Sequence, residues 1–148
     1  MPTIQQVMST DFHCVSSELP LSMAEELLLK RGLPELFVTN DQGELVGILT
    51  DYALIRCRLT EPMNRLTVQA RCTPVCVFLT PESSLTTAAT LVRLNVNARV
   101  PVISGGQVVG IVTRRAVYLA LADDSSGEST TVPRPAFLDR PAQSFPLS

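Results

Sequence analysis

The sequence predicts an α/β fold made of two similar repeats related by a pseudo-twofold axis. The first observation is that one order of strand-like and helix-like segments occurs twice along the chain. The second is that 45% of the residues are hydrophobic and only 18% are charged, as in chains that fold around a core. The third is size, because a unit of about 60 residues buries too little surface to be stable alone. We therefore expect the two repeats to pack against each other through their sheets.

The repeat is clearest in the first helix of each unit. Leu21 to Leu27 reads LSMAEEL, and Leu85 to Leu91, 64 residues later, reads LTTAATL. Leucine and alanine recur there with the spacing of the apolar face of a helix. Each segment follows a strand-like stretch, at residues 13–15 and 77–79, and a Ser/Thr-Glu cluster typical of helix starts. We predict that six residues of these helices lie on buried faces: Leu21, Ala24, Leu27, Leu85, Ala88 and Leu91.

A hairpin and a second helix follow in both repeats. In the first repeat, β-prone residues 36–39 and 45–50 flank a turn, and residues 100–103 and 108–113 do so in the second. Apolar helices are then expected from Asp51 to about Leu59 and from Arg114 to about Leu121. Each repeat is thus predicted to run strand, helix, strand, strand, helix.

The predicted organisation has three segments. Residues 1–66 hold the first repeat with an N-terminal segment, residues 67–122 hold the second repeat, and residues 123–148 form a tail. The tail begins with an acidic, serine-rich stretch and continues with four prolines: Pro133, Pro135, Pro141 and Pro146. We expect it to lack regular structure, with Phe137 and Phe145 available to dock in a groove.

Two tetrads end the predicted hairpins. They are Gly47-Ile48-Leu49-Thr50 and Gly110-Ile111-Val112-Thr113, each behind a matching helix. Together with Met8-Ser9-Thr10-Asp11 and residues 99–103, they resemble CBS (cystathionine-beta-synthase) repeats across residues 4–122. The resemblance implies a tandem CBS pair, or Bateman module, which is a regulatory unit that binds adenosine-type ligands in clefts between its repeats. It also implies association through the helices into a disc-like dimer.

The same resemblance implies that Thr50 and Thr113 contact the ribose or phosphate of a ligand. From the residues alone, each threonine is a helix cap, and the two roles are compatible. Nucleotide-binding members carry aspartate three residues later, where this chain has Ala53 and Ala116. Asp51 is no substitute, because a shift of two residues on a helix turns the side chain by about 200°. The departure counts against ordinary binding of AMP or ATP.

Three arginines indicate an anion-binding site in the second repeat. Arg114 and Arg115 begin a helix, where positive charge opposes the helix dipole, and Arg99 stands where the resemblance implies a phosphate contact. Glu35 and Asp51 are expected to make the first repeat repel phosphate. We predict a ligand whose anionic end lies near these arginines and whose neutral part lies between Thr113 and residues 10–12. The alternative is that the arginines are solvated or form salt bridges across a dimer. The predicted ligand-binding residues are Thr10, Asp11, Phe12, Thr50, Arg99, Pro101, Thr113, Arg114 and Arg115.

Other classes of protein are disfavoured by charge and composition. A net charge of -2 gives no general attraction to nucleic acid, and no run approaches the ~20 apolar residues of a membrane span. A signal-peptide pattern is also missing, so a cytoplasmic protein is expected. The 4 cysteines lack zinc-knuckle spacing and are interpreted as structural thiols, with Cys14 and Cys76 in apolar strands. The single histidine is His13, and the sequence shows no serine-histidine-acid combination, metal cluster or paired-carboxylate motif, so we predict neither an enzyme nor a metal site.

We therefore predict a regulatory module that binds a small, anionic, adenosine-nucleotide-like ligand and signals to a partner protein through the geometry of a homodimer. Residues 27–29 and 117–121 are expected to supply the dimer interface. The alternative is a ligand-free homodimerisation or protein-docking module. Ala53 and Ala116 favour this alternative, whereas the three arginines favour ligand binding.

Overall fold

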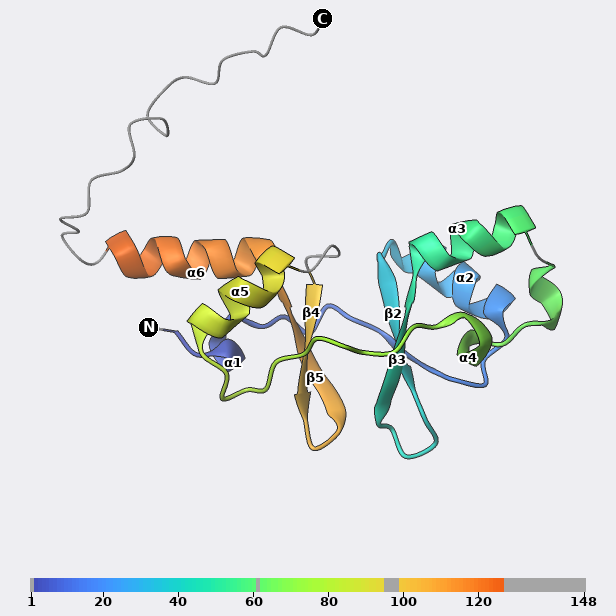
Figure 1. Cartoon of the computed structure of the whole chain (residues 1–148), viewed down its shortest axis with the longest axis horizontal. Helices are drawn as coiled ribbons and strands as arrows, with labels where there is room; N and C mark the ends of the chain where they lie inside the picture. The colour runs from blue at the N-terminus through green and yellow to red at the C-terminus, as the bar shows by residue number, and fades with distance from the viewer. Residues whose placement is uncertain (1, 61, 95–98, 127–148) are drawn as a thin grey trace, which may run out of the picture.

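The computed structural model describes residues 2–60, 62–94 and 99–126. The first repeat contains β1 (Cys14–Ser16), α2 (Leu21–Arg31), β2 (Glu35–Thr39), β3 (Leu45–Thr50) and α3 (Asp51–Thr60). The second contains α5 (Leu85–Leu94), β4 (Arg99–Ser104), β5 (Gln107–Thr113) and α6 (Arg114–Ser126). Shorter elements are α1 (Ile4–Val7), η1 (Met63–Arg65) and α4 (Val68–Arg71). The two hairpins meet in the middle, and the helices cover their outer sides (Figure 1).

The two sheets differ at their first strand. In the first repeat β1 pairs parallel with β2, and β2 pairs antiparallel with β3. The second repeat has the β4–β5 hairpin, but residues 77–79 contribute only a single bridge between Leu79 and Val102. The N–H of Phe37 donates to the His13 carbonyl at 2.9 Å, whereas the equivalent Pro101 has no N–H to donate. The predicted strand therefore shrinks to one bridge.

Each repeat receives a short helix from the segment that precedes the other repeat. Ile4 of α1 is fully buried in the core of the second repeat, and Val68 of α4 is fully buried in the core of the first. The exchange places α1 beside α5 and α6, and α4 beside the first repeat (Figure 1). Ser9 and Ile111 exchange two backbone hydrogen bonds of 2.8 Å. These crossed segments bind the two repeats into one unit.

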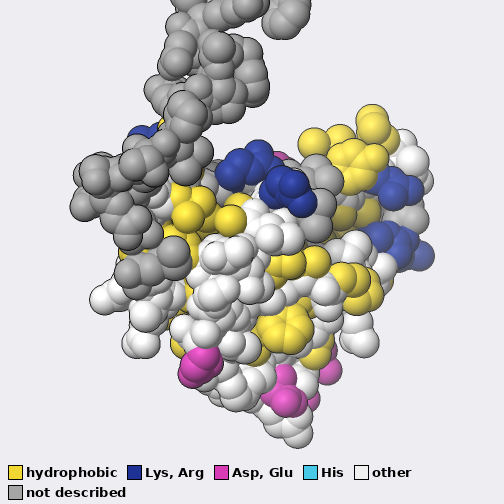
Figure 2. Space-filling view, turned by 60° about the vertical axis from the view of Figure 1, so that its left-hand side comes forward, with side chains coloured by type: hydrophobic (Ala, Val, Ile, Leu, Met, Phe, Trp, Pro, Cys, Tyr) yellow, Lys and Arg dark blue, Asp and Glu magenta, His cyan; other side chains and the backbone are white. Residues whose placement is uncertain are grey.

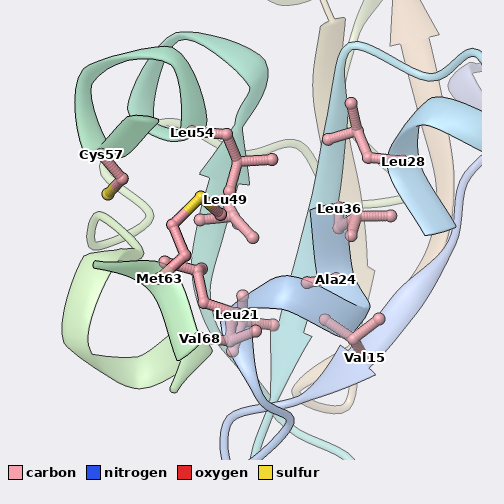
Figure 3. Packing of buried hydrophobic residues seen from close by; sticks show 11 residues of the cluster. Val15, Leu21, Ala24, Leu28, Leu36, Leu49, Leu54, Cys57, Met63 and Val68 are labelled. Carbon is pink, nitrogen blue, oxygen red and sulfur yellow. The ribbon is translucent and has the colours of Figure 1, made fainter. Parts of the chain in front are cut away.

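The cores match the helical pattern of the sequence. Leu21, Ala24, Leu85 and Ala88 are buried, as predicted, and each belongs to the hydrophobic cluster of its own repeat. Leu27 and Leu91 are half-buried and pack against the same clusters. In the first repeat, side chains of α2, β3 and α3 converge with those of η1 and α4 (Figure 3). Each fully buried leucine contributes about 1.5–3 kcal/mol of hydrophobic free energy.

The last helix is longer than the sequence pattern indicates. The prediction ended this helix near Leu121 and placed residues 123–129 in a structureless linker, but α6 continues to Ser126. The prediction was wrong for residues 123–126. Ala120 and Ala122 are strong helix formers, and they carry the helix past the point where the apolar pattern fades. The expected behaviour of residues 127–148, including Phe137 and Phe145, lies outside the described residues.

Candidate ligand-binding clefts

Two pseudo-equivalent places lie between the repeats, and we call them the first and the second cleft. The first cleft is bounded by the start of α3 and the segment Thr73–Val77 that precedes the second repeat. The second cleft is bounded by the start of α6 and the segment Ser9–His13 that precedes the first repeat. The two crossing segments form both clefts. Thr73 pairs with Ile48 at the first cleft, just as Ser9 pairs with Ile111 at the second.

The two threonines that end the hairpins cap the following helices. The hydroxyl of Thr50 accepts the N–H of Ala53 at 3.2 Å, and that of Thr113 accepts the N–H of Ala116 at 3.1 Å. Both threonines are half-buried. The capping role inferred from the residues is confirmed. A hydroxyl that accepts one hydrogen bond can still donate its own proton, so the cap leaves a ligand contact open.

The first cleft contains a cavity of about 170 Å³ with walls from both repeats. Glu35 and Ile48 come from the first repeat, Arg99 and Pro101 from the second, and the connecting segment adds Thr73, Pro74, Cys76 and Val77. Cys76 is exposed, so its interpretation as a buried structural thiol was wrong. The cause is again Pro101, because without its N–H the segment around Cys76 is not drawn into the sheet.

A wider hollow of about 490 Å³ adjoins this cavity, and Thr73 lines both. Among the residues that the structure describes, its lining includes Ala53, Arg56 and Arg71 and no acidic residue. Asp51 lies elsewhere, in an outer groove between α2 and α3. The expectation that Glu35 and Asp51 make the first repeat repel phosphate stays a prediction, although neither residue lines this hollow. Arg71 escaped sequence reasoning because α4 reaches the first repeat by crossing over, which local periodicity does not indicate.

Glu35 and Arg99 form an ion pair across the pseudo-twofold axis. They occupy equivalent positions 64 residues apart, and Arg99 Nε donates to Glu35 Oε1 at 2.6 Å. Arg99 Nη2 also donates to the Asp11 carbonyl at 2.8 Å. The second oxygen of Glu35, Oε2, is buried and has no hydrogen-bond partner among the described residues. Burial raises the pKa of Glu35 above its ordinary value, and the hydrogen bond from Arg99 opposes that rise.

Aromatic rings occupy the second cleft. Phe12 and Phe37 pack edge to face, with ring centroids 5.9 Å apart. The equivalent residues at the first cleft are Cys76 and Pro101, which line its cavity. The two clefts thus differ mainly in how much side-chain volume fills them.

The predicted site residues are brought together only in part. Arg99 contacts Asp11 and shares a cavity with Pro101, while Thr10 is exposed at the other cleft. Arg114 lines the outer groove between α5 and α6, where its Nη2 donates to the Val92 carbonyl at 3.2 Å. Arg115 is exposed in the first turn of α6. Arg99 thus bonds to Glu35 and the Asp11 carbonyl, whereas Arg114 bonds to the Val92 carbonyl on the outer side of the second repeat.

Over residues 2–60, 62–94 and 99–126, no three His, Cys, Asp or Glu side chains gather closely enough to hold a metal ion. In the same part of the chain, every helix is too short or too polar to cross a bilayer.

The chain belongs to the CBS-domain family. The family model for the CBS domain matches twice, at residues 4–59 and 68–123, which confirms the tandem pair and its α/β fold. The CBS-pair protein CBSX2 of Arabidopsis thaliana is similar, at 26% identity with a TM-score of 0.74, over 84% of this chain and 96% of that one. Its structure in complex with AMP has a TM-score of 0.71, covering 84% and 99%. An uncharacterized protein, MJ1225 of Methanocaldococcus jannaschii, is 23% identical over 121 residues, which are 82% of this chain and 43% of that protein.

Proposed function

We propose that this CBS pair is a regulatory module that binds a small adenosine-nucleotide-like ligand in the first cleft. The observation that carries the proposal is the joining of a cavity to a basic hollow at Thr73. Pockets for drug-sized ligands start at roughly 300 Å³, so the cavity of about 170 Å³ suits one ring system. The structure of CBSX2, similar at 26% identity, was determined with AMP.

Each part of such a ligand has matching groups in this cleft. A nucleobase amine would donate to Glu35 Oε2, which removes the cost of leaving a buried acceptor unpaired. Phosphate would lie in the hollow near Arg56 and Arg71, where charge-assisted hydrogen bonds are strongest. The side chain of Ala53 has no group that could hydrogen-bond to a ribose, so the phosphate and base contacts supply most of the affinity.

Regulation follows from the position of the cleft between the repeats. Glu35 and Arg99 come from different repeats, so a ligand that touches both changes the free energy of one arrangement of the repeats more than that of another. We propose that a homodimer passes this change to a regulated partner protein, with no catalytic step. The exposed apolar side chains of the outer helices suit the dimer, among them Leu29, Leu59 and Tyr118.

The test of the proposed ligand site is to place an aromatic ring in the first cleft, as Phe12 does in the second. Cys76→Phe places a ring at the position equivalent to Phe12. At about a hundredfold excess over Kd, AMP, ADP or ATP should stabilise the parent chain by about 2.7 kcal/mol in a thermal unfolding assay. The same nucleotide should not stabilise the variant. Arg56→Ala with Arg71→Ala should weaken binding about tenfold.

Two control variants decide between the clefts. Phe12→Leu, and the double variant Arg114→Ala with Arg115→Ala, change only the second cleft or the outer groove and should bind as the parent does. If Phe12→Leu loses binding while Cys76→Phe keeps it, the ligand lies in the second cleft. If no nucleotide raises the melting temperature, the ligand-free docking module is the better function. Its support is that Phe12 and Phe37 fill one cleft and that both ribose-binding aspartates are missing.

A further inference from the structure

Cys76 combines exposure to solvent with a place in the wall of the first cleft. Its side chain lines the cavity of about 170 Å³, at the position equivalent to Phe12, whose ring occupies the second cleft. Cys76 Sγ lies 3.8 Å from the carbonyl oxygen of Pro74, which is a weak hydrogen bond that the thiol can give up. A group added to this sulfur would therefore fill part of the first cleft.

The other cysteines are less accessible than Cys76, and all 4 lie in the described residues. Cys57 is buried, and Cys14 and Cys72 are half-buried. Burial raises the pKa of the Cys14 and Cys72 thiols above their ordinary value, so a smaller fraction of them is thiolate at neutral pH. A reagent that needs both access and a thiolate should therefore react first at Cys76.

The same cavity has a buried acid in its wall. Glu35 lines the cavity and is only 4% exposed. Its Oε1 accepts a hydrogen bond from Arg99 Nε, whereas Oε2 is buried and has no hydrogen-bond partner among the described residues. A buried acceptor without a partner costs free energy, and a charged N–H donor satisfies a carboxylate better than a neutral donor does. The cavity therefore favours a small group that carries an ammonium.

We propose that Cys76 is a site of reversible modification by small disulfides that carry a primary ammonium group. The Cys76 thiolate attacks one sulfur of the disulfide, a bond forms between that sulfur and Cys76 Sγ, and the original S–S bond breaks. The departing half leaves as a thiolate and takes up the proton that Cys76 lost. Cys76 is thus oxidised, and the departing half is reduced. The half that stays bound places its ammonium toward Glu35 Oε2.

The modification would regulate the first cleft. The added group occupies the cavity that we assign to the nucleobase, so it should exclude the nucleotide until a reductant removes it. This consequence rests on the proposed function, whereas the modification itself does not.

The probe is cystamine, which is the disulfide of cysteamine, and hydroxyethyl disulfide is its uncharged counterpart of equal length. The full chain is equilibrated with each disulfide and its thiol at fixed ratios, and mass spectrometry of its peptides gives the modified fraction of each cysteine. Cystamine should modify Cys76 first. After the same ratio for free cysteine is divided out, its mixed disulfide should be about tenfold more stable than the hydroxyethyl one. Glu35→Gln should abolish this preference, and Cys76→Ser should leave that segment unmodified.

The matched control removes an acid from the surface, because surface acids also attract a cationic probe. Figure 2 shows acidic side chains at the lower end of the molecule, where Figure 1 places the hairpin turns. Asp41→Asn, at the exposed turn between β2 and β3, should keep the tenfold preference. An equal loss of preference in Asp41→Asn and Glu35→Gln would overturn the role of Glu35. Circular dichroism checks that each variant is folded, and the comparison of the two disulfides on the parent chain needs no variant.

The outcomes separate this proposal from the nucleotide site. Modification that falls first on Cys14, Cys57 or Cys72, or a parent chain without preference for the ammonium, overturns the proposal. In the thermal unfolding assay, nucleotide stabilisation that disappears on modification of Cys76 and returns with a reductant supports regulation of the cleft. Full stabilisation of the modified chain overturns that regulation. A parent chain that no nucleotide stabilises, but that cystamine modifies as expected, overturns the nucleotide site and supports the modification site.

Discussion

The two clefts show how one repeat pattern yields two different environments. Positions 12 and 37 at the second cleft hold aromatic rings in contact, whereas the equivalent positions 76 and 101 hold a cysteine and a proline beside a cavity. The backbone pairing is the same at both, with Ser9 on Ile111 and Thr73 on Ile48. The fold therefore supplies two sites by symmetry, and a few side chains decide which of them stays open.

The charges between the clefts follow the same logic. Glu35 and Arg99 are equivalent residues that diverged in sign, and because they lie across the pseudo-twofold axis they now bond to each other. Asp51 and Arg114 also diverged in sign, but they line two different outer grooves. A change of charge near the axis thus joins the repeats by an ion pair, while a change of charge at the outer grooves gives the two repeats different surfaces.

The largest expected difference between the two places lies in the glycine that each crossing segment packs against. A Cβ at Gly47 would lie 2.9 Å from the carbonyl oxygen of Thr73, which is backbone, and 2.8 Å from Cys72 Sγ. The three atoms nearest to a Cβ at Gly110 would all belong to the side chain of Met8, with Sδ at 2.6 Å. Because a methionine side chain can move aside, Gly110→Ala should cost about 1 kcal/mol, and Gly47→Ala about 3 kcal/mol.

Urea unfolding of the two alanine variants measures both costs. A Met8→Ala background is the control, since it should relieve the cost of Gly110→Ala and leave that of Gly47→Ala unchanged. Equal costs for the two glycine substitutions would contradict the difference in packing between the two glycines.

Sequence reasoning reached the fold and only part of the site. Leu21, Ala24, Leu85 and Ala88 could be predicted because a helix repeats its buried face locally, and the glycine tetrads repeat with it. The crossing of α1 and α4 could not, because a four-residue helix carries no signal for which repeat it packs against. Arg71 reaches the hollow only through that crossing. The contact between Phe12 and Phe37 joins residues 25 positions apart, which no local pattern encodes.

A second prediction concerns Glu35, the acid between the clefts. Burial raises its pKa in the folded protein, with Asp51 and Asp11 adding to the rise and Arg99 opposing it. The folded state thus binds its proton more tightly than the unfolded state. Stability from this group is full below the ordinary value of 4.5 and is lost as the pH rises through the raised value. Glu35→Gln should therefore gain stability relative to the parent as the pH rises above about 4.5.

Glu25→Gln is the control with the opposite sign. The hydrogen bond from Arg58 is the main cause that lowers the pKa of Glu25. Its stabilising effect is present above the unfolded value and is lost as the pH falls through the lowered value, so this variant should lose its disadvantage in acid. Urea unfolding from pH 3 to pH 8 gives both curves. Parallel curves for the parent and Glu35→Gln would show that burial of this carboxylate does not govern its titration.

The smallest expected effect on stability is at Pro101. This proline lacks the backbone N–H that the equivalent Phe37 donates in the other sheet. In the first repeat, the N–H of Phe37 donates to the His13 carbonyl at 2.9 Å. Pro101→Val supplies an N–H at the equivalent position of the second repeat, and this N–H should donate to the Val77 carbonyl in the same way. One such bond contributes about 1 kcal/mol, and loss of the proline's rigidity offsets about 0.4–1 kcal/mol, so the net stability change should be small. Amide hydrogen exchange is the sharper measurement. The new amide at position 101 should exchange slowly, and Cys76 should become less reactive toward a thiol reagent as its segment is drawn against β4. An amide that exchanges as fast as an unfolded one would mean that the missing donor is not what holds the first cleft open.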